Sequence, residues 1–117
     1  RLRDLGRAAM GTADQSTGRF LFEAVASAGA QAAGRSSGQI TEGKIADLMA
    51  VSTDNEFLCN RLGDTVLDSL VFTGRGRGCV TDVWSAGRHM VKDGRHIHRD
   101  HIVARFIKVT NQLGPNI

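Results

Sequence analysis

The residues best suited to metal chemistry are two histidines near the carboxyl end, in the run His96-Ile97-His98. Alternate residues of a strand point to the same side, so these two imidazoles stand at ligand spacing. A zinc site would need at least one more His, Asp or Cys nearby. His101 and Asp100 are close in sequence, but Asp100 is better explained as the N-cap of a following helix. We therefore expect a solvated turn with ordinary histidines, and metal binding is the alternative.

A glycine-rich segment, Thr73-Gly74-Arg75-Gly76-Arg77-Gly78, is the next candidate. Its backbone amides could cradle a phosphate, and its two arginines could add charge. Phosphate loops need a strand before the glycines and a helix after them, whereas the flanking patterns here come in the opposite order. We expect a mobile or tightly turning connector, and phosphate binding is the alternative.

Asp47 is a third candidate, because it interrupts the apolar run Ile45 to Val51. Burying a carboxylate is costly unless it is hydrogen-bonded or paired. We expect Asp47 to accept hydrogen bonds from backbone amides, from Lys44 or from an arginine. A role as an acid or a metal ligand is the alternative.

Composition limits the classes of partner. The chain has 117 residues, enough for one small domain, and a formal charge of +3. Its cations are interspersed with acids and only 5% of its residues are aromatic, so we expect no nucleic acid as partner. Cys59 and Cys79 lack metal spacing, and we expect reduced thiols in a cytoplasmic protein. No apolar run is long enough to span a bilayer and no signal-peptide pattern is present, so we expect no membrane partner.

Helices are predicted at the beginning of the chain. Residues from Arg1 to Met10 carry apolar side chains at intervals of three and four, which predicts an amphipathic helix. Ser16 or Thr17 can cap a second helix that closes at Gly34. Its small residues from Ala26 to Ala33 permit the close approach of another backbone. Because the first residues resemble the middle of a helix and no initiator Met precedes them, we expect a fragment.

Strands follow the helices. A polar turn from Thr41 to Lys44 precedes the run Ile45 to Val51, which has the length of one buried strand. Val80 to Lys92 predicts a hairpin that turns at Ala86-Gly87, in which Trp84 supplies the largest apolar contact. The chain turns again at Asp93-Gly94.

The remaining segments predict a loop and two helices. Asn55 to Asp64 has no period and predicts a surface loop, after which Asp64 could cap a short helix that continues to Val71. A final amphipathic helix runs from Asp100 to Leu113, where Gly114-Pro115 ends it.

Two sets of segments carry a family resemblance. Gly29 to Gly34, followed by Gly38 to Leu48, resembles the join between the last barrel helix and the small β-sandwich of the amidohydrolase superfamily. The later segments together resemble the carboxyl end of the formimidoylglutamate deiminases of histidine degradation; they are Asp64 to Phe72, Val80 to Trp84, Gly87 to His96 and Asp100 to Phe106. The resemblance covers the chain from about Thr17 onward.

The resemblance implies an α+β chain in two parts. Residues 1–34 would be helices from the end of a (β/α)8 barrel, and residues 35–117 the carboxyl-terminal share of a composite β-sandwich with a terminal helix. In the family a zinc-activated water attacks the formimino carbon of N-formimino-glutamate and releases ammonia. The family's metal ligands are an HxH pair, two later barrel histidines and an aspartate, all upstream of Arg1.

His96 and His98 lie in the wrong part of the chain to be that HxH pair. The resemblance therefore implies no catalytic, cofactor-binding or metal-binding residue in this chain. Zinc belongs to the parent family, and the chain alone is expected to be inactive.

Exposed strand edges and an apolar face would favour association. We expect a homo-oligomer, or pairing with the missing amino-terminal part of the same enzyme. Two alternatives remain open: a free-standing assembly or binding module derived from such a domain, and a fragment of another amidohydrolase deaminase, acting on a purine or related ring.

Overall fold

The computed structural model describes residues 15–74 and 76–114, so the helix predicted from Arg1 to Met10 lies outside the described residues. Helices lie at both ends of the described chain and strands between them, which confirms the α+β class. The elements are α2 (Thr17–Ala32), β1 (Leu48–Val51), α3 (Asp64–Phe72), α4 (Gly76–Cys79), β2 (Val80–Ser85), β3 (Arg88–Lys92), β4 (Arg95–His96) and α5 (Arg99–Leu113).

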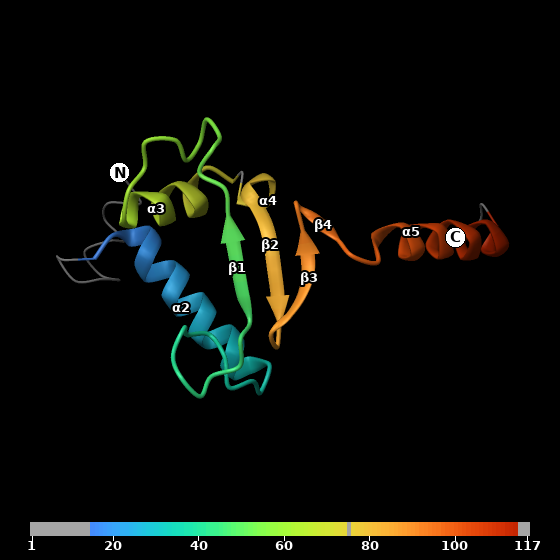
Figure 1. Ribbon diagram of the computed structural model, residues 1–117, viewed down its shortest axis with the longest axis horizontal. Coiled ribbons are helices and arrows are strands. Elements are labelled where there is room, and N and C mark those ends of the chain that lie inside the picture. The colour runs from blue at the N-terminus through green and yellow to red at the C-terminus, as the bar shows by residue number, and fades with distance from the viewer. Residues whose placement is uncertain (1–14, 75, 115–117) are drawn as a thin grey trace.

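The strands form one antiparallel sheet in the order β1-β2-β3-β4. Figure 1 shows α2 and α3 beside β1, at one edge of the sheet, and α5 extending away from the opposite edge. The radius of gyration is 18.1 Å. A compact chain of this length would have about 13 Å, so the projecting helix makes the molecule elongated.

Helix α2 begins and ends where the sequence predicts. The Oγ of Ser16 accepts a hydrogen bond from the Arg19 amide, which caps the helix. At the other end Gly34 takes a φ of 63° and its amide donates to the Gln31 carbonyl, while the Arg35 amide donates to Ala30. This pair of bonds is a Schellman motif, which needs the left-handed conformation that glycine adopts without strain.

Helix α2 packs against α3 at a glycine. The Gly18 amide donates to Oδ1 of Asp68 at 2.7 Å, and a Cβ added to Gly18 would lie 2.5 Å from the Asp68 Cα. Asp64 was predicted to be the N-cap of α3, and that prediction is wrong. Gly63 holds the N-cap position, and the Asp64 carboxylate accepts instead from the Ser16 amide and from Arg19 of α2.

The small residues of α2 do permit a close approach, as predicted. The backbone at Gly38 crosses the helix so closely that an added Cβ would lie 2.7 Å from the Ala26 carbonyl oxygen and 3.0 Å from the Ala30 Cβ.

Strand β1 is shorter and less buried than predicted. The turn at Thr41 to Lys44 forms, since the Lys44 amide donates to the Thr41 carbonyl and Gly43 has a φ of 82°. The residues from Ile45 to Asp47 are not part of the sheet, because the Ile45 amide bonds to Ser36 and the Asp47 amide to Ile45. Only Leu48–Val51 pairs with β2, and no residue of this strand is fully buried.

Both strand turns carry the expected backbone. Ala86 and Gly87 have φ values of 50° and 77°, and Asp93 and Gly94 have 49° and 72°. Two successive residues at positive φ make a type I′ turn, whose twist matches that of the flanking strands. The predicted hairpin and the second turn are therefore confirmed.

The segment before α3 is not simply a surface loop. Asn55 organises it, since its Oδ1 accepts from the amides of Phe57 and Leu58 and its Nδ2 donates to the Ser52 carbonyl. The Leu58 side chain is thereby turned inward and is only 1% exposed. Among the described residues, Leu58 and Cys79 alone are buried hydrophobic side chains.

The glycine-rich connector contains the single helical turn α4, with α3 before it and β2 after it. Helix α5 has His98 and not Asp100 at its N-cap, so that prediction is also wrong. Asp100 lies instead in the first turn and pairs with Arg95. A carboxylate there is favourable for the helix dipole.

Candidate functional site

The two histidines at ligand spacing do not converge on a vacant position. The rings of His96 and His98 are 5.8 Å apart and tilted, and the His98 amide donates to Nδ1 of His96 at 3.1 Å. That bond uses Nδ1 of His96, which leaves only Nε2 of this ring for a metal. Within residues 15–74 and 76–114, no three His, Cys, Asp or Glu side chains are grouped so that they could hold a metal ion.

A pair of one histidine and one aspartate, which the sequence did not indicate, lies on the hairpin. Nε2 of His89 is 2.7 Å from Oδ1 of Asp82, and the His89 ring stacks on Trp84 with centroids 4.5 Å apart. A hydrogen bond from Thr81 and, next in importance, one from His89 lower the pKa of Asp82. An aspartate-oriented imidazole is typical of general bases, but both side chains also tie β2 to β3. The predicted turn at Ala86-Gly87 could have indicated this pair, because it sets the register that brings Asp82 of β2 near His89 of β3.

Asp47 takes the structural role that was expected. Its two oxygens accept from Nη2 and Nε of Arg35 at 2.8 Å each, and Oδ1 also accepts from the Ala86 amide at 2.9 Å. These bonds, that of Arg35 foremost, lower the pKa of Asp47 from 3.8 to about 2. The carboxylate therefore joins the end of the α2 segment to the tip of the hairpin, and both of its oxygens accept from protein donors.

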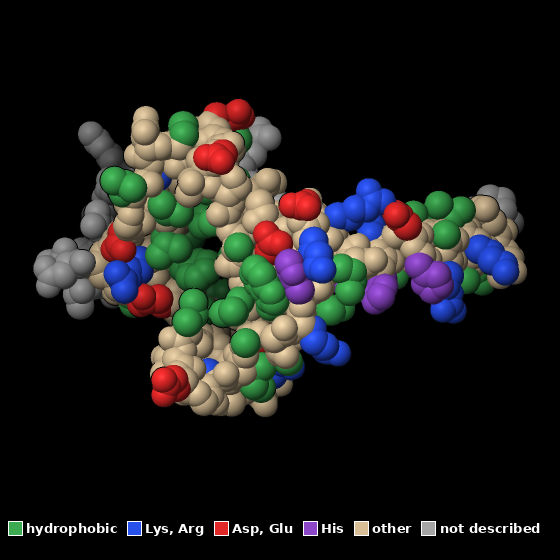
Figure 2. Space-filling view, in the orientation of Figure 1, with side chains coloured by type: hydrophobic (Ala, Val, Ile, Leu, Met, Phe, Trp, Pro, Cys, Tyr) green, Lys and Arg blue, Asp and Glu red, His purple; other side chains and the backbone are tan. Residues whose placement is uncertain are grey.

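A groove of about 850 Å³ lies between α2, the segment around Ile40 and the start of α3. Arg19 spans its charged side, with Nε 2.8 Å from Glu23 and Nη1 3.2 Å from Asp64. Phe22 and Leu67 contribute apolar lining. Figure 2 shows hydrophobic side chains gathered between α2 and the sheet, where the surface is hollowed. The charged groups of this groove pair with one another, and its lining is a mixture of polar and apolar residues.

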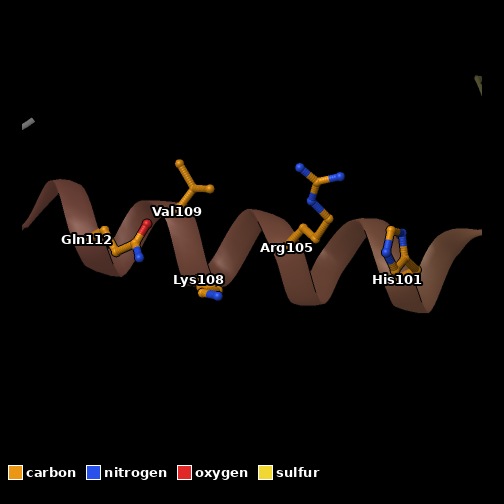
Figure 3. A pocket seen from close by; sticks show the side chains of 5 residues that line it. All are labelled: His101, Arg105, Lys108, Val109 and Gln112. Carbon is orange, nitrogen blue, oxygen red and sulfur yellow. The ribbon is translucent and has the colours of Figure 1, made fainter.

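The second surface of note is α5. His101, Arg105, Lys108 and Gln112 follow one side of this helix, beside a shallow hollow of about 520 Å³ to which Val109 also contributes (Figure 3). In Figure 2 the projecting arm carries Lys, Arg and His side chains with few acids. The arrangement offers positive charge and hydrogen-bond donors, but no nucleophile with an adjacent base.

The remaining sequence candidates are the two cysteines and the glycine-rich segment. Cys59 is exposed and Cys79 is buried, and no disulfide joins them. The glycine-rich segment is interrupted by residue 75, which lies outside the described residues. Among the helices of the described chain, none has both the length and the apolar character needed to cross a membrane.

Comparison with known proteins finds similarity to two amidohydrolase-type proteins. No protein-family model matches the chain. It is 37% identical over 114 residues to formimidoylglutamate deiminase from Pseudomonas aeruginosa, in a match that covers 97% of this chain and 25% of that protein. It also matches the crystal structure of an amidohydrolase from Brucella melitensis with a TM-score of 0.73 and 34% identity, over 97% of this chain and 24% of that one. The chain thus spans about a quarter of the length of these relatives.

Proposed function

The chain is related to the carboxyl-terminal region of the amidohydrolases, and we propose that it serves as that region in an enzyme most like formimidoylglutamate deiminase. The observation that carries this proposal is the identity of 37% sustained over 114 residues. The structural match over the same share of the chain supports it, because helices and sheet are shared as one arrangement.

The proposed contribution of the chain to that enzyme is structural. Zinc, which the resemblance implies for the whole enzyme, would activate water. The described residues do not fit a zinc site, because no third His, Cys, Asp or Glu is grouped with His96 and His98. No step of the reaction is therefore assigned to this chain, and we expect it to be inactive alone.

The experiment that tests this proposal is a chimera. Residues 1–117 replace the matching quarter of the Pseudomonas aeruginosa deiminase, and ammonia release from N-formimino-glutamate is measured. We expect the chimera to be active, and a deletion variant without that quarter to be inactive.

Two results would contradict the proposal. One is deiminase activity together with stoichiometric zinc in the 117-residue chain alone. The other is an inactive chimera combined with a cooperative melt and a monodisperse assembly of the isolated chain, which would favour a free-standing assembly module.

A further inference from the structure

Helix α5 carries an apolar stripe that no described part of the chain covers. Ile102, Phe106, Val109 and Leu113 are between 49% and 69% exposed, and none of the 15 residues of α5 is buried. Figure 1 shows the helix extending away from the sheet, beyond β4. Val103 and Ile107 of the same helix are exposed as well. Six large apolar side chains exposed on one isolated helix, four of them in a single stripe, indicate a surface that is covered in the functional protein.

The spacing of the four apolar residues and the charges beside them indicate which kind of surface covers α5. Its members are separated by four, three and four residues, which is the spacing with which one helix packs along another. The basic stripe of His101, Arg105 and Lys108 lies next to it, roughly a quarter turn around the helix. A matching surface would present an apolar groove with carboxylates or other acceptors along one rim.

The structural match indicates which partner covers α5. It covers 97% of this chain, so a helix of 15 residues lies largely within it, and yet it covers only 24% of the related amidohydrolase. The relative therefore holds a corresponding helix and sheet together with a much larger body of chain.

Resting on the proposed function, we infer that α5 docks through Ile102, Phe106, Val109 and Leu113 onto the remaining body of the same amidohydrolase. Arg105 and Lys108 face acceptor groups on the rim of that docking surface. The helix is a fastening arm between this region and the part of the enzyme that bears the catalytic centre.

A second copy of the chain fits the same helix less well. Arg99, Arg105 and Lys108 outnumber the single acid of α5, Asp100, so two paired α5 helices would bring like charges within a Debye length. The helix is also short: a strip roughly 22 Å by 10 Å is far smaller than the about 800 Å² that each partner of a stable dimer buries. A larger body can contact the apolar and basic stripes together.

The test uses the full 117-residue chain, tagged and co-expressed with the Pseudomonas aeruginosa deiminase that lacks the matching quarter. The variant Phe106→Asp places a charge in the stripe, and the matched control Asn111→Asp adds the same charge on a side of α5 away from it. We expect the native chain and the control to co-purify with the body and to restore deiminase activity. Phe106→Asp should bind at least about 30-fold more weakly, as for the loss of an aromatic anchor.

The outcomes separate this inference from the proposed function. If the native chain and Phe106→Asp bind equally and both restore activity, the docking role of α5 is refuted while the proposed function stands. If the native chain neither binds nor restores activity, and the chimera is inactive too, the proposed function fails. A dimer of the chain alone that Phe106→Asp dissolves, and that the body does not displace, would assign α5 to a second copy and overturn the inference.

The chimera provides a second measurement if the deleted enzyme does not fold. We expect hydrogen exchange of the α5 amides to be slow in the chimera and fast in the isolated chain. Phe106→Asp should restore fast exchange in the chimera, whereas Asn111→Asp should not. Equal exchange of α5 in all three chimeras would contradict the inference.

Discussion

Replacing Leu58 by alanine should remove a large share of the stability of the isolated chain. Leu58 is 1% exposed, and it is the one side chain of the described residues that is fully buried. The substitution removes three carbon atoms, about 2.4 kcal/mol at ~0.8 kcal/mol for each, and leaves a cavity that adds to this loss. We expect a destabilisation of about 3 kcal/mol, within the ~2–5 kcal/mol typical of this substitution.

The effect is large relative to the stability available. Domains of this length have free energies of unfolding of roughly 6–18 kcal/mol. An elongated chain whose described residues contain only two buried hydrophobic side chains should lie near the lower end. The substitution would then remove about half of the free energy of unfolding.

The assay is urea unfolding followed by tryptophan fluorescence. Trp84 is the single tryptophan of the chain and lies in β2, so its emission reports on the sheet and not on the loop that is changed. The midpoint should fall while the slope of free energy against urea stays constant. Leu62→Ala is the matched control, because Leu62 belongs to the same segment but is 84% exposed. The control should change stability by less than about 0.5 kcal/mol.

Equal effects of the two substitutions would refute the reasoning. They would mean that the segment organised by Asn55 does not present Leu58 to the core. A change in slope for Leu58→Ala alone would instead indicate that the unfolded or native state had changed its compactness.

Three further predictions concern the backbone and the Asp47 junction. Because the pKa of Asp47 is lowered from 3.8 to about 2, its ionised form stabilises the fold above about pH 4, and this contribution is lost as the pH falls towards 2. Asp47→Asn should therefore flatten the decline of the urea midpoint between pH 4 and pH 2, and an unchanged decline would count against the Arg35 contact. Gly18→Ala should force α2 away from Asp68 and cost about 1–3 kcal/mol in urea unfolding, whereas a neutral result would show that the helices separate freely. Ala86→Asn should raise the free energy of unfolding by about 1 kcal/mol, since Ala86 has a φ of 50° and asparagine tolerates that conformation better. Loss of stability on this change would contradict the type I′ assignment.

The elements that local chemistry determines were predictable. Ser16 caps α2, Gly34 ends it and Ala86-Gly87 turns the hairpin, because each residue satisfies a requirement of its own immediate backbone. The small residues of α2 also predict that another backbone approaches this helix closely, which the segment at Gly38 does.

The errors occur where one particular side-chain contact prevails over the sequence pattern. Asp64 has the chemistry of an N-cap, but its carboxylate bonds to the start of α2, and Asp100 is drawn to Arg95. Leu58 is buried although the residues around it have no period, since one asparagine folds that segment inward. Asp82 and His89 meet through the register of β2 against β3, which follows from the predicted turn at Ala86-Gly87 but was not used to look for a pair.

The sheet order has a consequence for how the chain folds. Strands β2, β3 and β4 form a meander within residues 80–96, joined by two tight turns, so their pairing closes only short loops. Strand β1 pairs with β2 across a long connection, with Leu48 opposite Trp84, and α2 meets α3 across separations of 48 and 50 residues. Because closing a longer loop costs more entropy, we expect the meander to form early and the α2–β1 portion to dock last. The carboxylate of Asp47, which bonds to Arg35 on one side and to the hairpin tip on the other, would then close the fold at the end of the process.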